Sequence, residues 1–96
     1  MIYLYINVYL YLYIMAELLA KLKSDLDQLA SANLDEETKE LVEGMREDIA
    51  DVLSNSNVPP FFSQRLSMLA MEFESSHPNL TSFVTQVANA LSNAGL

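Results

Sequence analysis

The sequence predicts an all-α protein, a small antiparallel bundle of about four helices preceded by a short apolar extension. From Met15 onward, apolar residues recur every three or four positions, which is the period of an amphipathic helix. Polar and proline-containing clusters interrupt that period and divide the region into four segments. Before Met15 the period is two. Residues 1–14 are therefore treated as an extension, and residues 15–96 as a single helical domain.

Composition limits both the core and the classes of partner. The chain has 96 residues, and a domain this short buries only about 60% of its unfolded surface, so self-association would help to stabilise it. Thirteen acidic and five basic residues give a net charge of -8, which argues against nucleic-acid binding because phosphates require a basic surface. There is no cysteine and nothing that indicates an oxidising compartment, so we expect a cytoplasmic protein.

Residues 1–14 alternate between aliphatic residues at even positions and tyrosines, with one asparagine, at odd positions. This pattern is typical of a β-strand, but a lone strand would present an unpaired apolar edge. A membrane segment is a second interpretation, although fourteen helical residues span about 21 Å of a hydrocarbon core of about 30 Å. A third is that the following helix continues toward the N-terminus and needs a bilayer or a partner to cover it.

The interpretation that we favour for residues 1–14 is a translated DNA repeat. Alternating T and A encodes alternating Tyr and Ile, and codons for the Leu, Val and Asn of this segment differ from those by a single base. Translation in the cell would then start at Met15, and the extension would not be native. The pattern leaves open whether these residues are strand, helix or disordered.

The first two helices are predicted at residues 15–30 and 36–53. Leucines and Met15 form the apolar seam of the first. Asp35 marks the start of the second, because an N-cap carboxylate accepts a hydrogen bond from a free amide and acidic residues suit the first turn. Gly44, in the middle of that helix, indicates either close approach of another helix or a tolerated soft point.

One face of the second helix carries acidic residues at steps of three and four. Its ordinary interpretation is a solvated face. A more specific interpretation is that this face is a docking surface for a partner with a basic surface, or for loosely held divalent cations. Monodentate acids without a calcium loop make a poor metal site, however. The residues of this acidic stripe are Glu36, Glu40, Glu43, Glu47 and Asp51.

The third helix is predicted at residues 61–75 and the fourth at residues 79–94. Prolines at the end of the 54–60 linker and at position 78 mark their starts. Beyond its main seam, the third helix carries further apolar surface from Phe61, Met68 and Met71, more than one neighbour can cover. Such a helix is central in a bundle or lies at a subunit interface. We expect an interface, and with it a homodimer formed through the third and fourth helices.

The sequence predicts no catalytic, cofactor-binding or metal-binding residue. His77 is the only histidine, and the adjacent Ser75 and Ser76 cannot form with it the geometry of nucleophile, base and orienting group. A histidine in this position more often caps a helix or packs at a turn. Glu72 and Glu74 point to different faces of a helix and do not form a paired acid and base. We therefore expect no enzymatic activity.

Two stretches and the C-terminal residues carry a family resemblance. They are LDEETKELV from Leu34, FESSHPNL from Phe73 and ALSNAGL from Ala90. With this spacing, residues 15–96 resemble the small bacterial proteins grouped as domain-of-unknown-function family 4404, and residues 1–14 have no counterpart. The resemblance implies a short all-helical cytoplasmic protein. It supplies no activity, ligand or catalytic residue.

Together these observations predict a small uncharacterised interaction protein that self-associates and offers its acidic helix to a partner. The alternative is a membrane-associated protein anchored by residues 1–14.

Overall fold

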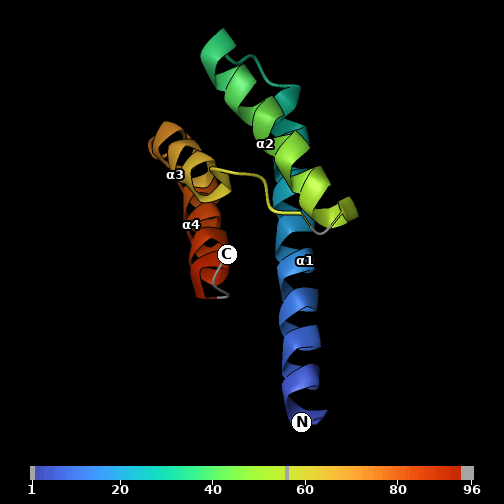
Figure 1. The fold of residues 1–96 in the computed structure, drawn as a ribbon. Coiled ribbons are helices and arrows are strands. Elements are labelled where there is room, and N and C mark those ends of the chain that lie inside the picture. The colour runs from blue at the N-terminus through green and yellow to red at the C-terminus, as the bar shows by residue number, and fades with distance from the viewer. Residues whose placement is uncertain (1, 56, 94–96) are drawn as a thin grey trace.

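The four predicted helices are present in the computed structural model, which describes residues 2–55 and 57–93, with side chains from residue 13 onward (Figure 1). They are α1 (Ile2–Ala30), α2 (Glu36–Asn55), α3 (Phe62–Glu72) and α4 (Pro78–Asn93). The predicted all-α bundle is confirmed. Ala94, where we expected the fourth helix to end, lies outside the described residues.

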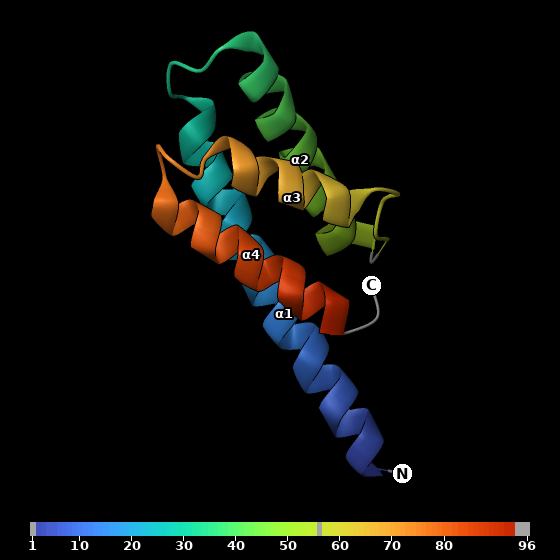
Figure 2. The same cartoon turned by 90° about the vertical axis from the view of Figure 1, so that its left-hand side faces the viewer.

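Each helix packs against two others. Contacts join α1 to α2, α2 to α3, α3 to α4 and α4 back to α1, and sequential helices run antiparallel. Figure 2 shows α3 and α4 in front of α1 and α2, with α4 running alongside α1. A hydrogen bond of 3.0 Å from Thr81 Oγ1 to the Ala70 carbonyl oxygen ties α4 to α3. The four helices therefore enclose one core.

Within the part of the chain whose side chains are described, fifteen buried apolar side chains from all four helices and the turn after α3 form the core. Burial of this apolar surface is the main driving force for folding. Leu53, near the end of α2, is an apolar residue whose side chain lies on the surface. The buried residues are Met15, Leu19, Leu22, Leu26, Val42, Met45, Ile49, Phe62, Leu66, Leu69, Phe73, Leu80, Val84, Val87 and Leu91.

Helix α1 begins at Ile2 and passes through Met15 without a break. Residues 2–14 are therefore helical, as the third interpretation held, and the strand interpretation is wrong for this structure. Twenty-nine helical residues span about 43 Å, most of the longest dimension of the molecule, 50 Å. The N-terminal part of α1 projects beyond the other helices (Figures 1 and 2). Over residues 13–55 and 57–93, no helix is long and apolar enough to cross a membrane.

The predicted start of α2 is confirmed. The Thr38 amide donates a hydrogen bond of 2.8 Å to Oδ1 of Asp35, and the Lys39 amide donates one of 2.9 Å to the Asp35 carbonyl oxygen. Hydrogen bonding from Thr38 lowers the pKa of the Asp35 carboxyl below its ordinary value. Asp35 therefore caps α2 in its ionised form.

Helix α3 is shorter than the predicted range 61–75. Phe61 has φ 66° and ψ 16°, a left-handed conformation, and acts as the N-cap residue outside the helix. At the other end, Phe73 departs from helical geometry with φ −102° and ψ 10°, and residues 73–76 form a turn. The His77 amide closes that turn with a hydrogen bond of 2.8 Å to the Phe73 carbonyl oxygen.

Candidate interaction surface

The structure divides the acidic stripe of α2 into engaged and open positions. Glu36, Glu40 and Glu47 are exposed, whereas Glu43 and Asp51 are half-buried. Asp51 Oδ1 accepts a hydrogen bond of 2.8 Å from the side-chain amide of Asn55. The stripe is therefore not one uniform surface.

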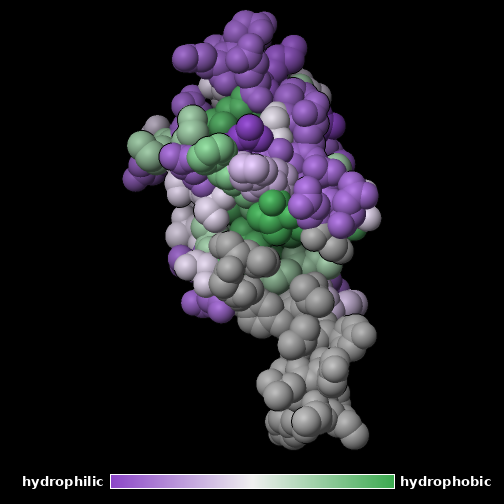
Figure 3. All heavy atoms as spheres, viewed as in Figure 1, coloured by the Kyte–Doolittle hydropathy of each residue, from purple (hydrophilic) through white to green (hydrophobic). Residues whose placement is uncertain are grey.

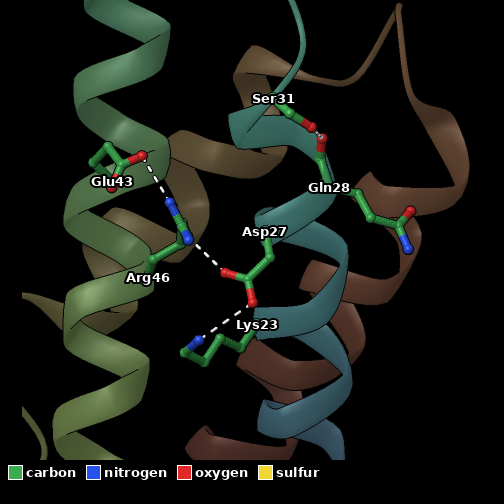
Figure 4. Close-up of polar contacts among 6 residues, drawn as sticks. All are labelled: Lys23, Asp27, Gln28, Ser31, Glu43 and Arg46. Carbon is green, nitrogen blue, oxygen red and sulfur yellow. Dashed lines mark hydrogen bonds and ion pairs between the residues drawn. The ribbon is translucent and has the colours of Figure 1, made fainter.

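Glu43 belongs to an ionic network that joins α2 to α1, shown in Figure 4. Arg46 lies between two carboxylates, with Nε 2.6 Å from Asp27 Oδ1 and Nη1 2.8 Å from Glu43 Oε1. Lys23 Nζ contacts the other oxygen of Asp27 at 3.3 Å. The hydrogen bond from Arg46 holds the pKa of Asp27 below its ordinary value, and the same bond raises the pKa of Arg46. This network positions helices and leaves Glu43 little freedom to bind a partner.

Glu40 and Glu47 line a groove between α2 and α3, with a volume of about 530 Å³, whereas Glu36 is not among its lining residues. We call it the acidic groove. The structure brings Glu40 and Glu47 together there with Met68, three of the predicted interaction residues. It adds two acids that were not predicted, Glu37 and Glu72. The lining residues are Glu37, Thr38, Glu40, Leu41, Gly44, Glu47, Arg65, Met68 and Glu72.

Two polar contacts fix α3 against α2 along the acidic groove. Arg65 Nη1 lies 2.5 Å from Oδ2 of Asp48, whose side chain is buried. Thr38 Oγ1 donates a hydrogen bond of 2.7 Å to Glu72 Oε1. Because one contact leaves from each half of α3, the helix cannot rotate about its axis without breaking one of them. The groove walls are therefore held in register.

The apolar candidates on α3 are exposed. Met68 retains 54% of its accessible surface, Phe61 retains 72% and Met71 retains 74%. Helical spacing puts Arg65 and Met68 on one face of α3, and both line the acidic groove, whereas Phe61 at the N-cap and Met71 do not line it. In Figure 3, apolar residues are interspersed among hydrophilic ones over α3, and hydrophilic residues predominate over α2.

Gly44 lies in the acidic groove, and a Cβ atom added there would meet no heavy atom within 4 Å. The predicted close approach of another helix is therefore wrong. The alternative, a tolerated soft point in α2, is the interpretation that fits. Its missing side chain adds open space to the groove.

A second groove, of about 660 Å³, lies between α1 and the start of α4. Its lining includes Lys21, His77 and Phe83, and Lys21 Nζ lies 4.7 Å from the centre of the Phe83 ring. That distance is typical of a cation–π contact. The lysine is thus already engaged within the groove.

His77 is an exposed turn residue at the start of α4. Its carbonyl oxygen accepts a hydrogen bond of 3.1 Å from the Thr81 amide, and its ring packs edge-on against Phe73 with centroids 5.2 Å apart. Of the two expected roles, packing at the turn is therefore seen. Nδ1 of His77 also lies 3.0 Å from Ser76 Oγ, a contact that the sequence argument did not anticipate. Among the side chains that the structure describes, no carboxylate hydrogen-bonds to the ring to complete a catalytic triad.

Within the described residues, no group of three or more His, Cys, Asp or Glu side chains is arranged to hold a metal ion. The acids of the groove are therefore spread along its walls rather than converging on one point.

The fold and this surface define a class, a small acidic four-helix protein with an open groove between two of its helices. The chain belongs to the family described as Domain of unknown function (DUF4404), whose model matches residues 15–96. The predicted family resemblance is thereby confirmed, including its boundary at Met15. Neither the curated proteins nor the solved structures compared with the chain gave a match.

Proposed function

We propose that this chain is a non-enzymatic interaction protein that binds another protein through α3 and its borders, and that it acts in the cytoplasm. The observation that carries the proposal is the exposure of Met68 and Met71 on the short helix α3 and of Phe61 at its N-cap. Large apolar side chains that cluster on the surface mark interaction sites more often than isolated ones do. The core excludes all three, so the fold does not explain their presence.

Site-specific photo-crosslinking tests this proposal. A photoreactive phenylalanine analogue replaces Met68 in one variant and Ser24, an exposed residue of α1, in the control. The expected result is a crosslinked product from position 68, whether to a second copy or to another protein, and little or none from position 24. Equal crosslinking from both positions, or none from 68, would contradict an interaction site on α3.

Self-association through α3 and α4 is the second part of the proposal. Every charged residue of the protein lies outside α4, which contains no Asp, Glu, Lys or Arg. Two copies that meet through this neutral helix avoid most of the repulsion that a net charge of -8 imposes. Light scattering of the protein at tens of micromolar should give the mass of a dimer, and a monomeric mass under those conditions would remove this part.

Membrane association is the alternative function, and the continuity of α1 through residues 2–14 supports it. A continuous helix satisfies its own backbone hydrogen bonds, as any segment in a lipid environment must. Fractionation of untagged protein from cells separates the two functions. A membrane-bound pool that salt does not release supports anchoring, whereas a wholly soluble pool excludes it.

A further inference from the structure

The acidic groove combines negative charge, an apolar wall and open space. Four carboxylates line it, from Glu37, Glu40 and Glu47 on α2 and Glu72 on α3. Among the described lining residues Arg65 is the one cation, and its guanidinium is paired with Asp48, below the groove. The carboxylates are thus left without a matching positive charge. An occupant of this groove must supply it.

The apolar wall favours an occupant with an apolar side chain as well. Met68 is half exposed and lines the groove directly. A methionine is suited to such a surface because its flexible, polarisable side chain adapts to different partners. Opposite it, Gly44 leaves room for a side chain from outside. A simple inorganic cation would use neither feature.

Phe61 adds a second, independent observation. A left-handed backbone costs a residue other than glycine about 1–2 kcal/mol, and strain of this kind concentrates at binding sites. Here the strained residue presents its ring to solvent, with 72% of its surface exposed. Phe61 lies at the N-cap of α3, four residues before Arg65, and does not itself line the groove. Its exposed ring is available to a partner that extends from the groove toward the start of α3.

A second copy of the chain is a poor occupant. Of its five basic residues, Lys23, Arg46 and Arg65 are held in ion pairs and Lys21 lies over the Phe83 ring. Two acidic grooves that approach each other would also repel. The charge and shape of the groove therefore match a different protein.

We infer that the acidic groove binds a basic, amphipathic segment of a partner protein. Lys or Arg side chains of the segment lie between Glu40 and Glu47, and an apolar side chain packs on Met68 and Phe61. This inference rests on the proposed interaction function, to which it adds the position of the site and the chemistry of the partner. Helix-in-groove recognition of this kind uses apolar anchors for affinity and charges for specificity.

The test measures binding of fluorescein-labelled peptides to the full chain by fluorescence anisotropy. The probe is a pool of helix-forming peptides of about twelve residues, with Lys at the polar positions and varied aliphatic residues along one face. One control pool carries Glu in place of Lys, and a second carries Ser in place of the aliphatic residues. Only the basic amphipathic pool should bind, and binding should weaken as salt screens the carboxylates.

Three protein variants locate the site. E40Q/E47Q removes two groove charges and should weaken binding about tenfold, whereas E17Q/E74Q removes two exposed charges elsewhere and should change it less than about twofold. G44L leaves the charge unaltered but fills the open space, and should also weaken binding. Circular dichroism and the thermal midpoint establish that each variant is folded. If G44L fails to fold, the two charge variants still decide the question.

Each outcome favours or overturns the inference. Equal loss in E40Q/E47Q and E17Q/E74Q would reduce the effect to net charge and overturn it. Binding of the acidic pool, or no binding of any pool at about 0.5 mM protein, would overturn it as well. Crosslinks from position 68 combined with either of those results would leave the proposed function standing and remove only the basic partner. Absence of both crosslinks and binding would remove the two together.

Discussion

Nη1 of Arg65 on α3 lies 2.5 Å from Oδ2 of Asp48 on α2, and the two side chains differ in exposure, at 43% for the arginine and 12% for the aspartate. The aspartate depends on the arginine, since its carboxylate has little contact with water. The arginine depends less on the aspartate, because solvent can hydrate its guanidinium.

This difference predicts unequal effects of removing either partner. R65M keeps much of the aliphatic stem but leaves the Asp48 carboxylate buried without its cation, and it should lower the free energy of unfolding by about 1–3 kcal/mol. D48N should cost less, because its amide oxygen can still accept from Arg65. Urea unfolding of the two single variants and the double variant checks this order. A greater loss in D48N than in R65M would contradict it.

At position 61, a glycine variant should be more stable than an alanine variant, which is the reverse of the usual order. At φ 66° an alanine keeps the steric cost of the left-handed region, whereas a glycine does not. F61G should therefore be more stable than F61A by about 1 kcal/mol, although glycine has the more flexible unfolded chain. Thermal unfolding of both variants measures the difference. Greater stability of F61A would indicate that residue 61 does not hold this conformation in solution.

Gly44 is a position at which the protein can gain stability. A Cβ atom there would meet no neighbour within 4 Å, and alanine is the better helix former. G44A should raise the free energy of unfolding by about 0.5–1 kcal/mol. Chemical denaturation is the measurement. A destabilised G44A would show that another element approaches α2 at this point.

Asp27 and Asp35 should make the protein sensitive to acid. The hydrogen bond from Arg46 lowers the pKa of Asp27, and hydrogen bonding from Thr38 lowers that of Asp35. A carboxyl with a lower pKa in the folded state stabilises the fold above its unfolded pKa, and this contribution disappears as the pH falls through the folded pKa. The thermal midpoint should therefore drop as the pH falls below about 4, the ordinary pKa of an aspartate.

The variant D27N/D35N tests the origin of that drop. It should start from a lower midpoint at neutral pH and show a shallower decline in acid, because two of the responsible carboxyls are gone. E74Q, at an exposed turn residue, is the control and should follow the unmodified protein. Identical acid profiles for all three proteins would assign the drop to other groups.

The bundle should fold without residues 1–14. Among the side chains that the structure describes, from residue 13 onward, Met15 is the first buried one, and the family match also begins there. A protein that starts at Met15 should therefore keep its helical circular dichroism per bundle residue and a thermal midpoint within about 5 °C of the full chain. A large loss of stability would mean that the N-terminal half of α1 supports the bundle.

Most of the fold follows from local signals that act over a few residues. The apolar period from Met15, the cap at Asp35 and the proline at 78 each act within one helical turn, and each predicted element is found. For residues 2–14 the local pattern pointed to the wrong conformation, because a period of two favours a strand when the segment is considered alone. In the structure they have no neighbouring strand, and the helix that follows continues through them. The conformation of these residues therefore follows the adjacent helix and not their own alternating pattern.

The candidate surface was predictable only in part. The acids of α2 are visible in the sequence, and Arg46, three residues after Glu43, could have indicated which of them is engaged. Glu72 could not be assigned to the same groove, because its place beside Thr38 depends on how α3 packs against α2. The left-handed backbone of Phe61 was also not predictable, since phenylalanine rarely adopts it.

The uninterrupted course of α1 through Met15 couples the two halves of that helix in rotation. Each residue of an α-helix turns the chain by about 100°, so a single residue inserted just before Met15 would swing the projecting half around the axis and leave the core in place. Seven inserted residues would restore nearly the original direction, about 20° short of two full turns. The bundle therefore fixes both where the projecting half of α1 lies and which direction each of its faces points, and so fixes the orientation of any partner that residues 2–14 contact.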